Sequence, residues 1–452
     1  MKRRIIHRVN HRYNKFRTSK SPQFNLVLGF LIYMLVGFLL LSLPIFHKLP
    51  VSFLDNLFIA ASAISTTGLV TVSVSDSYNL GGQLVVAALI QLGGIGYMTL
   101  TTYYLLFTTK TISHWHRRLM GTEFALPKDI EIQDFLRSVV LFTLVMEILG
   151  AIFFFIGFAD AGMAFGERLW SSIFHSISAF CTAGFGLDNN SFVLYQNDVL
   201  INTVISVLAI AGSLGFIVIT DLYYRLSGRS KSLTFTTRMI VTGFLLLLGF
   251  GTLLVRFTEP TIYTSGESMW LKSFFQAMTA MTTVGFNTID TGALSLPILM
   301  AVIFLMYIGA SPSGTAGGMK ITTLTAMIAI LSSRLKGKAR VSFLGRRIPG
   351  ERLFVATSIF ILYTSLIFLA TTALTYSEAQ PLDKLLFEVA SALGTVGLST
   401  GITGSLSVVG KVIFILLMFV GRVGVLTFGF ALLERKQRKE SKVVILEDDL
   451  AI

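Results

Sequence analysis

The sequence predicts an all-α polytopic membrane protein in which four parallel repeats surround a central pore. Hydrophobic residues make up 53% of the 452 positions and charged residues only 13%, whereas a soluble globular protein carries about 25% charged residues. Eight apolar runs are long enough to cross a bilayer. Between alternate pairs of them lies a shorter apolar stretch that ends in glycine. We therefore expect eight transmembrane helices and four re-entrant half-helices, arranged as span, pore helix and span.

The eight predicted spans follow from the length of the apolar runs, because about 20 residues of helix cross the hydrocarbon core. The spans cover residues 21–46, 81–109, 137–159, 199–220, 239–255, 294–333, 353–377 and 411–433. The sixth is interrupted by small and polar residues. Gly-rich stretches in the second and fourth, "LIQLGGIGYMTL" and "LAIAGSLGFIVI", are explained by close packing of helices.

Basic residues follow every second span, which sets the orientation. Short loops rich in Lys and Arg stay in the cytosol, so both termini are predicted to be cytosolic, including a basic tail at 1–20 and a second tail at 435–452. The basic residues are Lys110, Arg117 and Arg118; Arg225, Arg229, Lys231 and Arg238; Arg334, Lys336, Lys338, Arg340, Arg346, Arg347 and Arg352; and Arg435, Lys436, Arg438, Lys439 and Lys442.

The outward loops hold the four short stretches, too short to cross the membrane. They read "LDNLFIAASAISTTGL", "LWSSIFHSISAFCTAGFG", "WLKSFFQAMTAMTTVGFN" and "LDKLLFEVASALGTVGLS". This self-similarity divides the chain into pore repeats at 21–118, 119–238, 239–352 and 353–434. Taken singly, each stretch is equally compatible with a re-entrant packing element or an amphipathic surface helix. Four in register favour a pore.

Such loops can coordinate a cation. Non-helical backbone survives at membrane depth only inside protein or along a water-filled cavity, where carbonyl oxygens replace the hydration shell of an alkali ion. Glycine permits the required backbone, and the negative C-terminal end of each half-helix favours cations. The predicted filter residues are Thr66, Thr67 and Gly68; Thr182, Ala183 and Gly184; Thr283, Val284 and Gly285; and Thr395, Val396 and Gly397. Asp76, Asp188 and Asp290 follow three of the loops and are predicted to concentrate cations at the outer mouth.

These motifs resemble the four pore loops of the Trk/Ktr/HKT potassium transporter superfamily, and the chain is most similar to its Ktr-type membrane subunits from about residue 24 to 434. In that family four glycines accompany selectivity for K⁺, although Thr182 stands where Asn is common. The resemblance implies a homodimer in a bacterial plasma membrane and a cytosolic nucleotide-binding regulatory ring of the KtrA type. It also leaves Na⁺ open as an activator, with no nucleotide bound by this chain.

The sixth span contains "YIGASPSGTAGGMKITT", which no continuous helix favours. A phosphate-binding loop is excluded, because Met319 precedes Lys320 and Ile321 follows it. The resemblance implies an intramembrane gating loop at 309–318 with an arginine beside it, here Arg422. The predicted gate residues are Gly309, Ser311, Ser313, Gly314, Thr315, Ala316, Gly317, Gly318, Lys320 and Arg422. The alternative is a structural Arg422 paired with Glu388 or Glu147.

The main hypothesis is therefore a K⁺-translocating subunit of a regulated uptake system. An ion-coupled secondary transporter for Na⁺ or a small solute remains the alternative, although such proteins normally show inverted repeats. The basic loop "SSRLKGKARVSFLGRR" suits either a regulatory partner or anionic membrane lipid. The net charge of +13 lies in short loops between spans, which argues against nucleic acid. The chain has no HExxH motif, no histidine cluster and a single cysteine, Cys181, so we expect no enzyme and no multi-cysteine metal site.

Overall fold

The computed structural model describes residues 21–96, 99, 132–188, 190–259 and 268–433. The tails at 1–20 and 435–452 lie outside these residues, as do the basic residues Lys110, Arg117 and Arg118. The cytosolic location of the termini and the repeat boundaries therefore stay predictions.

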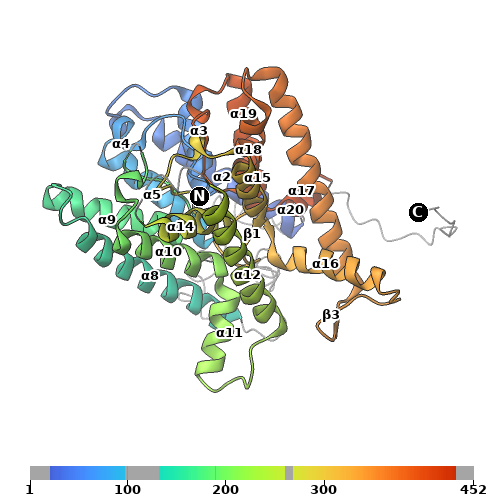
Figure 1. Cartoon of the computed structure of the whole chain (residues 1–452). Helices are drawn as coiled ribbons and strands as arrows, with labels where there is room; N and C mark the ends of the chain where they lie inside the picture. The colour runs from blue at the N-terminus through green and yellow to red at the C-terminus, as the bar shows by residue number, and fades with distance from the viewer. Residues whose placement is uncertain (1–20, 97–98, 100–131, 189, 260–267, 434–452) are drawn as a thin grey trace, which may run out of the picture.

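Long apolar helices form the outside of the molecule (Figure 1). They are α2 (Pro22–Leu41), α8 (Ile132–Gly157), α12 (Phe235–Thr258) and α17 (Gly350–Ser377). These four are long and apolar enough to cross a membrane, and the described residues offer up to six spans if two bent helix pairs are each counted as one. Their outward side chains, such as Leu246 and Phe368, are exposed and suited to lipid. The predicted helical, multi-pass class is confirmed.

Four shorter helices lie inside this shell. They are α3 (Phe53–Ile64), α9 (Phe165–Phe180), α14 (Met269–Thr282) and α18 (Leu382–Gly394). At least half of the residues of each helix are buried; in α18 every residue from 387 to 394 is buried. This burial argues against amphipathic surface helices. None of the four is long enough to span the bilayer, because a helix rises only about 1.5 Å per residue.

The helices that follow the short ones are broken, and here the sequence prediction was partly wrong. We predicted continuous spans at 199–220 and 411–433. Instead α10 (Val199–Leu214) meets α11 (Phe216–Leu226) at 89°, and α19 (Val408–Val423) meets α20 (Val425–Leu432) at 101°. The breaks fall at Gly215 and Gly424, whose φ angles of 83° and 93° are accessible to glycine but not compatible with an α-helix. The corresponding helix after α3 is α5 (Leu80–Ile95), and it ends at Gly96, whose φ is 85°.

The predicted sixth span is interrupted by a longer non-helical segment, as its composition indicated. Helix α15 (Leu296–Tyr307) ends before β1 (Ile308–Gly309), which pairs in parallel with β2 (Met319–Lys320) and so closes the 309–318 loop. Helix α16 (Ile321–Leu335) then runs outward to a hairpin of β3 (Ser342–Phe343) and β4 (Arg346–Arg347) (Figure 1). The remaining elements are α4 (Val74–Ser77), η1 (Pro44–Phe46), η2 (Val193–Tyr195), η3 (Thr291–Ala293) and η4 (Thr403–Ser405).

Candidate cation pathway

The four short helices end in the same backbone turn. In each turn a threonine and, two residues later, a glycine have positive φ. The angles are 52° and 92° at Thr66 and Gly68, 51° and 65° at Thr182 and Gly184, 56° and 75° at Thr283 and Gly285, and 48° and 94° at Thr395 and Gly397. A positive φ is unusual for β-branched threonine and persists only where the surroundings hold it.

The same backbone hydrogen bond stabilises this conformation in all four turns. The residue before each glycine donates its backbone N–H to the carbonyl of a helix residue five positions earlier. The donor–acceptor distances are 2.9 Å for Thr67 to Ser62, 2.8 Å for Ala183 to Ser178, 3.2 Å for Val284 to Thr279 and 2.8 Å for Val396 to Ser391. The turn is thus tied to the end of its own helix in all four loops.

The four glycines meet around one point. A β-carbon on Gly68 would collide with the carbonyl oxygen of Ala183, one on Gly184 with Val284, one on Gly285 with Val396 and one on Gly397 with Thr67. Each loop therefore abuts the next, and the fourth abuts the first. All four glycines line the same cavity of about 350 Å³. We call Gly68, Gly184, Gly285 and Gly397 the four-glycine ring.

Buried hydroxyl groups lie next to the ring. The hydroxyls of Thr66 and Thr395 are buried and have no hydrogen-bond partner among the described residues. Thr182 and Thr283 instead contact the 309–318 loop: the Thr182 hydroxyl lies 3.1 Å from that of Thr315, and Gly317 donates its N–H to Thr283 over 3.0 Å. Uncharged oxygens, carbonyl and hydroxyl, thus surround this part of the molecule, which is the ligand type that alkali cations take in protein filters.

Of the three predicted outer-mouth acids, Asp188 lines the 350 Å³ cavity. Its side chain is exposed to the cavity, yet the surrounding protein removes enough solvent to raise the pKa of its carboxyl above the usual range. Asp76 and Asp290 are exposed and are not among the described residues that line this cavity. Asp290 instead caps a short turn, accepting from the Gly292 N–H over 2.9 Å.

The 309–318 loop packs against Thr182, Thr283 and Thr395, the positive-φ threonines of the second, third and fourth turns. Thr315 donates its N–H to the carbonyl of Gly212 over 3.0 Å, and Ser311 donates to Ser213 over 3.2 Å. A side chain at Gly317 would collide with the Thr395 hydroxyl and the Gly394 carbonyl. The loop therefore touches the second, third and fourth of the turns.

Arg422 joins this loop to α5. One terminal nitrogen, Nη1, donates to the carbonyl of Thr315, and the other, Nη2, donates to those of Gly93 and Gly94. Gly93 and Gly94 lie in the last turn of α5, where carbonyls have no partner within the helix. The two acids considered as alternatives bond elsewhere. Gln91 donates to Glu147 over 3.2 Å, and the Thr400 N–H donates to Glu388 over 2.8 Å.

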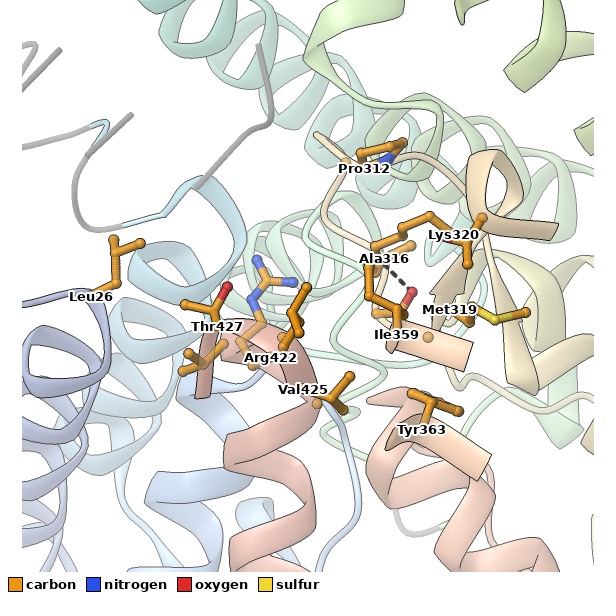
Figure 2. Close-up of a pocket in the computed structure, with 18 of the residues that line it drawn as sticks. Leu26, Pro312, Ala316, Met319, Lys320, Ile359, Tyr363, Arg422, Val425 and Thr427 are labelled. Atoms are coloured by element: carbon orange, nitrogen blue, oxygen red, sulfur yellow. Dashed lines mark hydrogen bonds between the residues drawn. The ribbon is translucent and has the colours of Figure 1, made fainter. Parts of the chain in front are cut away.

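A second cavity of about 530 Å³ opens beyond the loop and Arg422. Figure 2 shows Arg422 and Lys320 in this cavity, with Arg422 at the end of α19 and Lys320 at the end of the loop. Lys320 is partly buried and directs its ammonium group back to the loop, at 2.8 Å from the Gly317 carbonyl. The loop, Lys320 and Arg422 thus separate this cavity from the four-glycine ring.

Sequence reasoning did not identify Gly93 and Gly94 as the partners of Arg422. The available signal was the repeated spacing of "GGIG", "GSLG" and "GRVG", which places Gly93, Gly212 and Gly421 at the same position of three repeats. A β-carbon on these glycines would collide with the carbonyls of Ile64, Phe180 and Leu393 respectively. Close packing therefore does explain these three glycines, whereas the glycine three residues later breaks the helix.

Comparisons with known proteins show which family this chain is similar to. The sequence profile of the TrkH family, described as a cation transport protein, matches residues 30–441. The potassium/sodium uptake protein NtpJ of Enterococcus hirae is 34% identical over 450 residues, covering 97% of this chain and 98% of the relative. The Ktr system potassium uptake protein B of Bacillus subtilis is 33% identical, covering 92% of this chain and 94% of the relative.

A solved structure has the same fold. The crystal structure of the potassium transporter TrkH from Vibrio parahaemolyticus superposes with a TM-score of 0.67 at 21% identity, covering 89% of this chain and 84% of that chain. The prediction of a membrane transporter rather than an enzyme is confirmed by these relatives. This chain belongs to the TrkH family of cation transport proteins.

Proposed function

We propose that this chain is the K⁺-translocating membrane subunit of a regulated Ktr-type uptake system in a bacterial plasma membrane. The observation that carries the proposal is the four-glycine ring, whose members line one cavity and abut one another through backbone carbonyls. A dehydrated K⁺ needs several oxygen ligands at once, and four converging backbone turns supply them without a competing positive charge. The names of the relatives in Enterococcus hirae and Bacillus subtilis support K⁺ as the cargo.

The filter in this proposal consists of the residues from Thr66 to Gly68 and their counterparts in the other three loops. The helix ends α3, α9, α14 and α18 direct partial negative charge toward the ring, which favours cations over anions. Asp188 attracts cations to the 350 Å³ cavity at the four-glycine ring, which we call the outer cavity. Ions then pass from that cavity through the ring toward the cavity beyond the 309–318 loop.

The gate consists of the 309–318 loop, Lys320 and Arg422. The loop contacts three of the four filter turns, and Arg422 holds it to the first repeat. A cation on this route meets a packed loop and a guanidinium group, so passage requires the loop to move. We expect a cytosolic nucleotide-binding ring of the KtrA type to control that movement, and a homodimer to provide one pore per protomer.

Complementation tests the proposal. Cells that lack K⁺ uptake should grow at limiting K⁺ when they express this chain with a regulatory partner, and vesicles containing the purified protein should take up K⁺ faster than Na⁺ or Li⁺. The relative named for both potassium and sodium makes Na⁺ the specific competitor. Failure to rescue with any partner, together with coupled uptake of Na⁺ or a small solute, would instead favour a secondary transporter.

A further inference from the structure

Two buried polar side chains lie behind the filter loops at the same position of their helices. Glu388 of α18 and His175 of α9 each precede the ring glycine of their loop by nine residues. Their exposed fractions are 0% and 1%. Both accept a hydrogen bond from the backbone N–H three residues after that glycine: Thr400 donates to Glu388 over 2.8 Å, and Leu187 donates to His175 over 3.2 Å.

Glu388 holds a longer stretch of its loop than a single amide. Its Oε1 also accepts from the hydroxyls of Ser399 at 2.6 Å and Thr400 at 3.1 Å, and its Oε2 accepts from the hydroxyl of Thr403 at 2.9 Å. Ser399 and Thr403 themselves line the outer cavity. The Glu388 carboxylate is therefore buried directly behind the wall of the 350 Å³ cavity. It holds Ser399, Thr400 and Thr403, which follow the ring glycine of the fourth loop.

His175 performs the same contact with a neutral ring. Its Nδ1 lies 2.8 Å from the carbonyl of Ser171, so this nitrogen carries the proton and donates. The other nitrogen, Nε2, is left with a lone pair to accept from Leu187. Phe192 and Phe286 pack against the imidazole, with ring centroids 5.1 Å and 6.3 Å away. The tautomer and the orientation of the ring are thus both set.

The other two loops lack this brace. The equivalent residues are Ile59, which has no polar group, and Gln276, whose side-chain nitrogen and oxygen have no partner within the described part of the chain. Because the glycine contacts run from the first loop to the second, third, fourth and back to the first, the second and fourth loops lie opposite each other. This particular brace is therefore two-fold across the ring, while the third loop is held differently, by the Thr279 hydroxyl, which donates to the Phe286 carbonyl over 2.6 Å.

We propose that Glu388 and His175 are positioning residues that set ion selectivity by holding opposite walls of the filter at the spacing that fits K⁺. This inference rests on the proposed function and names residues that do not touch the ion. A filter whose walls relax accepts the smaller Na⁺ more readily, because its oxygens can then close around that ion. Loss of a brace should therefore lower discrimination more than the rate of transport.

The test compares initial rates of K⁺ and Na⁺ entry into proteoliposomes that carry the full chain. Glu388→Ala should lower the K⁺-to-Na⁺ rate ratio by at least about fivefold, while Glu388→Gln, which keeps the shape and one acceptor oxygen, should retain most of the ratio. His175→Ala should shift the ratio in the same direction. The matched control is Glu378→Ala, because Glu378 is also a buried acceptor, bound to Ser407 at the start of α19 and not to a filter loop.

The outcomes are distinct. An unchanged ratio in Glu388→Ala, or an equal fall in Glu378→Ala, would overturn the inference while leaving K⁺ transport intact. If Glu388→Ala yields no folded protein, Ser399→Ala, Thr400→Val and Thr403→Val each remove one donor to the carboxylate. Smaller falls in these variants support the brace, and unchanged ratios in all three overturn it. Wild-type vesicles without K⁺ preference would overturn the proposed function and this inference with it.

Discussion

The guanidinium of Arg422 donates to the backbone carbonyl of Thr315, and so ties the end of α19 to the middle of the 309–318 loop. This contact explains how an arginine is accommodated within an apolar run, where a cation costs at least about 2.5 kcal/mol. Carbonyls at the C-terminal turn of α5 and on the loop replace its water. The same contacts hold the loop across the proposed ion route.

Replacing Arg422 with alanine should increase K⁺ entry. Hydrogen bonds to a charged group contribute about 1.5–3 kcal/mol, so releasing the loop should raise the unregulated rate by about tenfold or more. Initial rates in vesicles without a regulatory partner measure this directly. Arg422→Lys serves as the control, because lysine keeps the charge but cannot reach Thr315 and Gly93 at once. A rate unchanged in Arg422→Ala would show that this residue does not restrict transport.

Deleting residues 313–317 should also increase K⁺ entry and weaken control by a partner, because these residues carry the contacts to the turns at Thr182 and Thr283. The expected rate equals or exceeds that of Arg422→Ala. Thr315→Val is the milder companion, since it removes the hydroxyl but keeps the carbonyl that Arg422 binds. Transport that stays regulated after the deletion would place the barrier elsewhere.

Substituting a ring glycine should impair K⁺ uptake. In Gly68→Ala the new β-carbon would collide with the Ala183 carbonyl, in addition to the strain of a φ of 92°. We expect K⁺ uptake to fall by more than about tenfold. Gly162→Ala separates the two effects, because Gly162 also has a positive φ, 67°, has open space around its β-carbon and is not among the residues that line the 350 Å³ cavity. Equal losses in both variants would mean that backbone strain, and not the ring, is responsible.

Uptake should depend on external pH through Asp188. Its folded-state pKa is raised, so the carboxylate gains its proton at a higher pH than an ordinary aspartate as the solution is acidified. For an assumed separation of about 10 Å between the carboxylate and the entering ion, losing one charge weakens the attraction by about 0.4 kcal/mol, which raises the apparent KM for K⁺ about twofold at low salt. Asp188→Asn should show that higher KM already at neutral pH and lose this part of the pH dependence.

The control for Asp188 is Asp290→Asn, because Asp290 does not line the outer cavity and asparagine caps a turn equally well. Its KM should match the wild type at every pH. If acidification raises the KM of Asp188→Asn as much as that of the wild type, another group is responsible.

The four glycine-terminated turns could be predicted from the sequence because the same pattern occurs four times. A single "TVGF" is compatible with many structures, whereas four glycine-terminated stretches between spans restrict the choices. The 309–318 loop was equally visible, since its glycines, serines and proline disfavour helix. In both cases the residues disfavour a continuous transmembrane helix, and the structure has a turn or loop at that position.

The breaks at Gly215 and Gly424 were not predictable in this way. An isolated glycine in an apolar helix serves close packing as well as it serves a bend. The chain uses both, with Gly212 packed against the Phe180 carbonyl and Gly215 at the bend three residues later. The backbone partners of Arg422 could not be predicted either, because the sequence does not show where α5 ends. The carbonyls of Gly93 and Gly94 are available as acceptors because α5 ends at Ile95, and nothing in the apolar pattern marks that end.

The most direct test of the central claim is the anomalous diffraction of Tl⁺, a heavy ion that substitutes for K⁺, bound to crystals of the full chain. We predict a peak enclosed by the carbonyls of the four-glycine ring that added K⁺ displaces and added Na⁺ does not. Tl⁺ density only at other positions, or a ring peak that Na⁺ removes as readily as K⁺, would contradict the account.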